Sequence, residues 1–419
     1  MRSVERQKGA VILTVAFALL FLLGFMAIAL DFGHLFVVKT ELQTAVDSCA
    51  LAAAQELDGG SDALTRATSA GRTAGNLNKV NFQGTPAGIG PGDITFSDSL
   101  TGAYSPYFTP VANAKYAKCT HTQSGMAPWL MQVLGAFAGN AAYGAPQSVR
   151  AVGVATRAPA QAVCNALPVQ IKPKSPASVC PSPFWGYCPG EWIPSLYNEG
   201  ANNAPAQPGQ FGWANLDNTT NASETKAEVL GKVPCDLTTG SPVGTPGGKV
   251  AVSTQWNSRF GLYVNGPGNP KITDAAPDTS GYSYRAKNWP SQANAVGDFL
   301  TKRAGFRSYG DTTDTINAGN TITGLGLNNN YKDALMGANN TSPNLLSVYG
   351  MDRRLVIAPI VPNNTIAAWA CLLMLHPIDG PQMTVYVEFV GDAASTTSPC
   401  AATGLPGGTT GPRVPVLVQ

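Results

Sequence analysis

Charged residues are scarce in this chain: Lys, Arg, Asp and Glu make up 12% of its 419 residues, and the net charge is +2. Proteins that bind nucleic acid carry a basic patch or stripe, so this balance gives no nucleic-acid footprint. Histidine is scarcer still, with three residues. His121 has no cysteine or carboxylate at the spacing of a metal site, and His376 precedes Pro377 at the end of a predicted strand. We therefore expect no metal and no cofactor.

Catalytic motifs are also missing. The sequence has no Gly-x-Ser-x-Gly, no His-Glu-x-x-His and no P-loop, and no Cys-x-x-Cys that would indicate a zinc ribbon or a thioredoxin-like site. Asp311 and Asp314 lie in a Gly/Thr/Asn-rich loop whose oxygens suit calcium, but the spacing is not that of an EF-hand, and we interpret this loop as a solvated turn. The sequence predicts a protein that is not an enzyme and has no evident small-molecule substrate.

One long apolar run stands out against this background. Residues 10–30 contain no charge over 21 positions. As a helix the run would be roughly 31 Å long, close to the hydrocarbon thickness of a bilayer, about 30 Å. Arg2, Arg6 and Lys8 precede it, and basic flanks stay on the cytoplasmic side. We expect a transmembrane helix over 10–30, a cytoplasmic tail over 1–9 and the rest of the chain outside the inner membrane.

Two kinds of processing compete with an uncleaved anchor. Ala27-Ile28-Ala29 resembles a signal-peptide cleavage site, although the apolar region of a signal peptide usually spans about 7–15 residues. A prepilin-type cut between Gly9 and Ala10 would leave Thr14 where type IV prepilins usually carry glutamate. Both features favour the uncleaved anchor, with His34 as an interfacial polar residue at the membrane edge.

The helical pattern continues beyond the apolar run. Apolar and small residues alternate at spacings of three and four, which predicts one contact stripe along a helix. The stripe comprises Leu35, Val38, Leu42, Ala45, Cys49 and Ala52. Gln43 and Gln55 lie off the stripe, and we expect them to face solvent. The stripe packs either on this chain's own domain or on a partner helix, and the sequence leaves both open.

The residues around this stripe resemble a known module. Asp31–Phe36 (DFGHLF) and Lys39–Ala54 (KTELQTAVDSCALAAA) are similar to the N-terminal segment of TadE/TadG-like proteins of the tight-adherence (Flp) pilus assembly system. The module covers residues 8–57 of this sequence. The resemblance implies an envelope protein of pilus biogenesis whose partners are other pilus assembly proteins or pilin subunits. Some relatives carry a von Willebrand factor A domain, but its Asp-x-Ser-x-Ser run is missing here.

Eight cysteines all lie on the predicted outer side, where an oxidising periplasm favours disulfides. Cys180 with Cys188, and Cys371 with Cys400, are candidate pairs, although sequence alone cannot fix connectivity. The first pair would close a loop rich in aromatic residues. Those residues, with one just after the loop, form a candidate contact loop for protein or glycan: Phe184, Trp185, Tyr187 and Trp192.

The chain is expected to fold as an α+β protein. After the membrane helix we predict periplasmic stalk helices over 31–80, the second one capped by Ser61 and buried along Leu64, Ala67, Ala70, Ala74 and Leu77. A pilin-like α+β domain follows over 81–158, then Pro/Gly/Cys-rich loops over 159–248. A β-rich C-terminal domain spans 249–400, and a tail spans 401–419.

Strands and helices within these regions are predicted from short apolar and alternating runs. Expected strands are 93–96, 107–109, 115–120, 149–155, 250–254, 259–264, 354–360, 369–376, 383–390 and 414–418. Expected helices are 128–137, beginning at Pro128, and 292–304.

Together these features predict a single-pass protein of the bacterial inner membrane, with a cytoplasmic N-terminus and the bulk periplasmic or at the cell surface. The resemblance implies that it assembles or anchors a tight-adherence pilus through protein contacts. Two alternatives stay open: a surface adhesin or glycan-binding protein acting through residues 185–192, and an envelope hydrolase with an unrecognised site.

Overall fold

The computed structural model describes residues 8–195, 206–218, 222–233, 235–244, 252–310, 318–327, 331–333, 345–380 and 383–419. The chain divides into two units: residues 1–157 together with 415–419, and residues 158–414. The predicted tail 1–9 falls mostly outside the described residues, and so does the loop with Asp311 and Asp314.

The first unit is built along one continuous helix, α1 (Lys8–Gln55). This confirms the single long apolar helix expected from the sequence. Apolar side chains of its first half are exposed, Phe17 and Phe25 among them. The helix is long and apolar enough to cross a membrane. Its second half is different, because one side of it is buried, with Val38, Leu42 and Ala45 among the buried residues.

A second helix, α2 (Ala63–Leu77), packs on this buried half of α1. The glycines Gly71 and Gly75 lie at the contact, and a Cβ on Gly71 would stand 3.1 Å from the Cys49 carbonyl oxygen. Small residues therefore allow the two helices to approach closely. The buried residues of α2 are Ala63, Ala67, Gly71 and Gly75. The predicted face was rotated from this one, and Leu77 is 79% exposed. The residue before the helix is Asp62, not Ser61.

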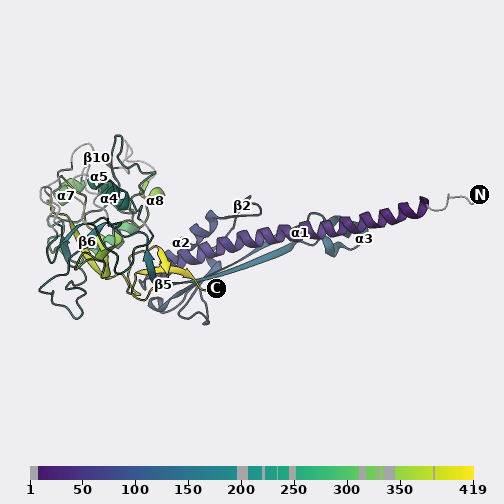
Figure 1. Ribbon diagram of the computed structural model, residues 1–419, viewed down its shortest axis with the longest axis horizontal. Helices are drawn as coiled ribbons and strands as arrows, with labels where there is room; N and C mark the ends of the chain where they lie inside the picture. The colour runs from purple at the N-terminus through teal and green to yellow at the C-terminus, as the bar shows by residue number, and fades with distance from the viewer. Residues whose placement is uncertain are drawn as a thin grey trace, which may run out of the picture. The chain divides into compact units, whose positions relative to one another are not determined.

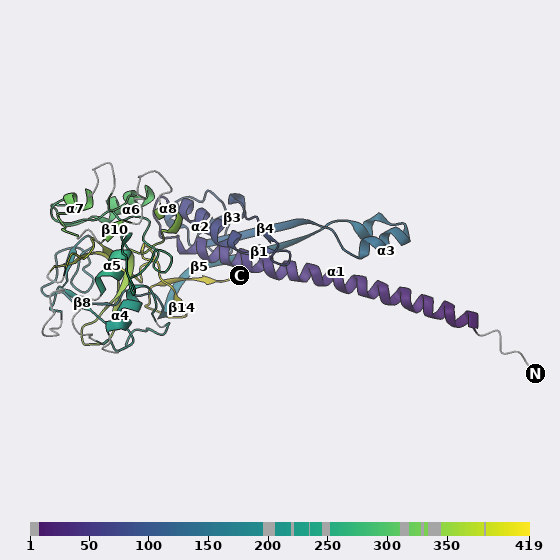
Figure 2. The same cartoon turned by 90° about the horizontal axis from the view of Figure 1, so that it is seen from above.

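The sheet of this unit is antiparallel and contains β3 (Ile94–Ser97), β4 (Tyr116–Met126) and β5 (Gln147–Val163). Figures 1 and 2 show β4 and β5 running alongside α1, with α3 (Met131–Ala138) at the tip of the hairpin that they form. Smaller elements are β1 (Lys79–Val80), β2 (Thr85–Pro86) and the 3-10 turns η1 (Pro91–Asp93), η2 (Val111–Asn113) and η3 (Ala141–Gly144). The strand expected over 107–109 is wrong, since that range is an irregular turn before η2.

The second unit is organised by a six-stranded sheet in the order β7-β13-β12-β11-β6-β8. Its strands are β6 (Val169–Ile171), β7 (Trp192–Pro194), β8 (Phe211–Trp213), β11 (Leu355–Ile360), β12 (Ala368–Met374) and β13 (Tyr386–Asp392). Successive residues of β12 enter different hydrophobic clusters, Leu372 one and Leu373 the other. Both faces of the sheet are therefore covered, which explains the unbroken apolar runs. These strands confirm the β-rich C-terminal region.

Helices and short strands surround this sheet in the second unit. They are α4 (Ala222–Val229), α5 (Ser253–Ser258), α6 (Val296–Ala304), α7 (Ala318–Thr323), α8 (Leu345–Tyr349), β9 (Leu262–Val264), β10 (Tyr331–Asp333) and β14 (Gly404–Pro406). The strand expected over 250–254 is wrong at its described end, because Ser253 and Thr254 begin α5.

The C-terminal segment, expected to be a tail over 401–419 with one strand over 414–418, contains two strands. Within the second unit β14 pairs with β5 around Ala162, and Cys400 and Ala402 are buried. The last strand, β15 (Arg413–Leu417), also pairs with β5. In the first unit Val154 N donates to the Gln419 carbonyl oxygen at 2.8 Å. Backbone pairing with a long central strand, which short-range sequence patterns do not reveal, fixes this segment.

Candidate functional site

Asp31 is the first charged residue after the apolar run, and it holds the tip of the β4–β5 hairpin. Its carboxylate accepts backbone N–H bonds from Trp129 at 2.8 Å, Leu130 at 3.1 Å and Met131 at 2.7 Å. These amides belong to the start of α3, where N–H groups lack partners inside the helix. Asp31 therefore caps α3 from another helix, 98 to 100 residues away in sequence.

His34 lies on the next turn of α1 and is 7% exposed. Its ring stacks on Trp129 with centroids 4.3 Å apart and on Phe82 with centroids 5.4 Å apart. Its Nε2 is 2.8 Å from Asn81 Oδ1. The loop between β1 and β2 and the hairpin tip thus cover the ring of His34, which we predicted to be an interfacial polar residue at the membrane edge. We call Asp31, His34, Phe82 and Trp129 the docking cluster.

Further along α1, polar side chains bind the same two segments. Glu41 accepts the Phe82 backbone N–H at 3.0 Å. Lys39 Nζ donates to the Arg150 carbonyl oxygen, and Gln43 Nε2 donates to the Val152 carbonyl oxygen at 2.8 Å. Lys39 and Gln43, the latter expected to face solvent, thus tie β5 to the helix.

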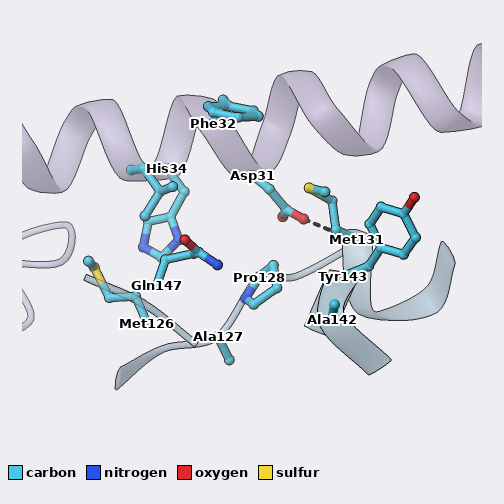
Figure 3. A pocket seen from close by; sticks show the side chains of 11 residues that line it. Asp31, Phe32, His34, Met126, Ala127, Pro128, Met131, Ala142, Tyr143 and Gln147 are labelled. Carbon is cyan, nitrogen blue, oxygen red and sulfur yellow. Dashed lines mark hydrogen bonds between the residues drawn. The ribbon is translucent and has the colours of Figure 1, made fainter. Parts of the chain in front are cut away.

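Figure 3 shows the Asp31 carboxylate reaching from α1 toward Met131. Around it lies a cleft of about 190 Å³ between α1 and the hairpin tip. Apolar side chains such as Phe32, Leu35 and Met126 line most of it. Because the carboxylate is already saturated by amides, the cleft offers a ligand little polar chemistry. Its geometry suits packing rather than catalysis.

The predicted contact stripe divides into two kinds of residue. Val38, Leu42, Ala45 and Cys49 are fully buried, whereas Leu35 and Ala52 are only partly buried. α2 of the same chain covers the region around Ala45 and Cys49, because a Cβ on Gly75 would lie 3.1 Å from Cys49 Cβ and 3.3 Å from the Ala45 carbonyl oxygen.

The opposite side of α1 is not free either. Gln43 is bonded to β5, as described above, and both side-chain polar atoms of Gln55 are buried without a partner among the described residues. The expectation that both glutamines face solvent is therefore wrong. The sheet thus contacts a second face of α1, on which the sequence has polar residues such as Gln43.

The candidate contact loop is mostly core. Tyr187 is 1% exposed and Trp192 8%, and Phe184 packs on the same cluster as Tyr187. Only Trp185, 38% exposed, is free to meet a partner. The rings of Phe184 and Tyr187 lie 6.2 and 5.7 Å from that of Phe389 on β13. These aromatic residues pack against the sheet, so few of them are exposed for binding to a glycan or another protein.

All eight cysteines are paired. Cys180 bonds Cys188 and Cys371 bonds Cys400, the two pairs named as candidates. Cys49 bonds Cys119 and Cys164 bonds Cys235. The Cys49 bond joins α1 to β4, so this stripe residue has an intrachain role. Beyond the even number of cysteines, no feature of the sequence indicates these last two pairs.

Buried ionisable groups of the second unit have structural partners. Glu388 accepts N–H bonds from Trp192 Nε1 at 2.9 Å and from Ala295 at 2.6 Å, at the start of α6, and burial raises its pKa. Burial lowers the pKa of His376 to about 3; its Nδ1 is 2.9 Å from the Pro377 carbonyl oxygen. In the part of the chain that the structure describes, no group of three or more His, Cys, Asp or Glu could hold a metal ion.

With this geometry established, comparison with known proteins is informative for the N-terminal segment. Residues 9–56 match the family described as "Putative Flp pilus-assembly TadE/G-like". This N-terminal segment is therefore TadE/G-like. The match coincides with α1 and contains Asp31 and His34, so the module supplies both the apolar helix and the α1 side of the docking cluster. No curated protein and no solved structure matches the chain.

Proposed function

We propose that this TadE/G-like chain is a single-pass protein of the bacterial inner membrane that assembles or anchors a tight-adherence pilus through protein contacts. The proposal rests on the family match over residues 9–56, which coincides with one helix. The first half of this helix has exposed apolar side chains, and its second half packs against the rest of its unit. An assembly protein needs such a helix, because it must be held in the membrane and still present a folded body outside it.

The proposed orientation places the N-terminus in the cytoplasm and the bulk in the periplasm or at the cell surface. The basic residues Arg2, Arg6 and Lys8 before the run support it. Four disulfides agree with an oxidising compartment. A periplasm-active reporter fused after Gln419 is expected to be active, and a cytoplasm-active one silent. The reverse pattern would refute the orientation.

The proposed mode of action is protein contact, and crosslinking in living cells tests it. Cells that produce the full chain at its natural level are treated with an amine-reactive crosslinker, and the adducts are identified by mass spectrometry. We expect pilin subunits or other pilus assembly proteins among the specific adducts. The control is the same treatment of cells that lack the chain. Reproducible adducts with envelope proteins unrelated to pili, and none with pilus proteins, would contradict the proposal.

A further inference from the structure

The tip of the β4–β5 hairpin is unusually apolar for a segment outside a membrane helix. Between Lys118 and Arg150 the sequence contains no Lys, Arg, Asp or Glu. Four large side chains of this tip are substantially exposed: Trp129 at 49%, Leu130 at 36%, Val133 at 48% and Tyr143 at 46%. Such a concentration of exposed apolar surface usually marks an interaction site.

The contacts with α1 fix the depth of this tip relative to the apolar run. Asp31, directly after the run, binds the amides at the start of α3. Ala27 lies on the same face one turn earlier and is 3% exposed, whereas Met26 and Ile28 beside it are exposed. Four residues of helix correspond to about 6 Å. The hairpin tip therefore lies beside the last turn of the apolar run as well as beyond it.

The chemistry of the tip matches the boundary between lipid and water. Tryptophan and tyrosine are enriched there, because each has an apolar ring with a polar edge. The charge at this level belongs to Asp31, and its carboxylate is 4% exposed and saturated by backbone amides. The first charged groups of the hairpin, Lys118 and Arg150, lie on the strands away from the tip, and Lys39 of α1 binds the Arg150 carbonyl oxygen.

We propose that residues 126–147 form a second membrane contact, seated in the outer interface of the bilayer that α1 spans. The occupant of this apolar face is lipid, because the face is continuous with the lipid-exposed surface of the apolar run. The proposal rests on the membrane span in the proposed function. The chain would then contact the membrane through both α1 and the hairpin tip. Two contacts limit rotation and tilting of the membrane helix.

Fluorescence quenching by lipid tests this seat in the full chain. Trp129 is the first of seven tryptophans, and the other six lie after residue 157. The chain is reconstituted into phosphatidylcholine–phosphatidylglycerol vesicles with brominated acyl chains. We expect bromine to reduce the emission of the natural chain, and Trp129→Phe to abolish that loss. The control Trp185→Phe, which removes an exposed tryptophan of the second unit, retains it.

A second variant shows whether a local packing defect in Trp129→Phe causes the loss of quenching. Trp129→Phe combined with Tyr143→Trp places a new reporter on the same tip, and its emission is expected to be quenched by lipid bromine. Equal quenching in the natural chain and Trp129→Phe, or quenching of the tip reporters by aqueous acrylamide alone, would overturn the proposal. If the chain floats with vesicles but the tip is not quenched, only this proposal fails. If it does not float, the proposed membrane span fails with it.

Discussion

Replacing Asp31 by asparagine tests the docking cluster with the smallest change in volume. The natural carboxylate accepts three amides with two oxygens: Oδ1 takes those of Trp129 and Leu130, and Oδ2 those of Leu130 and Met131. Asparagine has one acceptor oxygen and one amide group that only donates. Asp31→Asn therefore leaves at least one of these N–H groups without its acceptor and removes the charge from all of them.

The size of the effect follows from these bonds. A hydrogen bond to a charged group contributes about 1.5–3 kcal/mol, so we expect the free energy of opening the hairpin tip to fall by about 2 kcal/mol. At about 1.4 kcal/mol per factor of ten, this corresponds to roughly 30-fold faster exchange of the Trp129–Met131 amides. The global unfolding transition should change less, because the strands and disulfides away from the tip remain intact.

Hydrogen–deuterium exchange of the detergent-solubilised full chain, followed by mass spectrometry of peptides covering 127–135, measures this directly. Asp98→Asn is the matched control: it removes an exposed carboxylate from the same unit, and such surface changes stay within about 0.5 kcal/mol. If exchange in 127–135 is the same in Asp31→Asn, Asp98→Asn and the natural chain, Asp31 does not hold the hairpin and the reasoning is refuted.

Three further predictions concern packing, disulfides and pH. Ala45→Leu is expected to lower the free energy of unfolding by about 1–3 kcal/mol, because the larger side chain overpacks the fully buried contact with α2. The control Thr44→Leu, at an exposed position, should change it by under about 0.5 kcal/mol in the same denaturant titration. Equal effects of the two variants would contradict this packing. The Cys49→Ala/Cys119→Ala double variant removes a disulfide between cysteines 70 residues apart, and its free energy of unfolding is expected to fall by about 4 kcal/mol through chain entropy. The bond would be excluded if the double variant unfolds like the natural chain and a reductant does not change the natural chain at these two cysteines. Burial raises the pKa of Glu228 from 4.5 to about 7, so its stabilising contribution is present below pH 4.5 and lost as pH rises to about 7. The melting temperature of Glu228→Gln, relative to that of the natural chain, should therefore be higher at pH 7.5 than at pH 5. A difference in melting temperature that does not change with pH would contradict the raised pKa.

The sequence was sufficient for those parts of the fold that local patterns determine. An uncharged run followed by spacings of three and four predicts α1, because both signals act within one helix. The apolar runs of β11–β13 predict buried strands, because both faces of their sheet are covered. The short separation of Cys180 and Cys188 likewise made that pair easy to name.

The candidate site could not be predicted in the same way, because it is made by contacts between distant segments. Asp31 and Trp129 are 98 residues apart, and no periodicity within α1 indicates that a hairpin tip will cover its polar residues. Gln43 reads as solvent-facing for the same reason. The sequence around Tyr187 and Trp192 suggests a contact loop, but aromatic residues are common in both binding surfaces and hydrophobic cores. Only the three-dimensional packing against the sheet shows that these two belong to the core.

The claim that the chain serves pilus assembly is tested most directly by counting pili on cells from which it has been deleted. Electron microscopy gives pili per cell, and immunoblotting gives the amount of pilin subunit. We predict that pili disappear while pilin remains at its natural level, and that the full chain supplied in trans restores them. Normal numbers of pili on cells that lack the chain would contradict it.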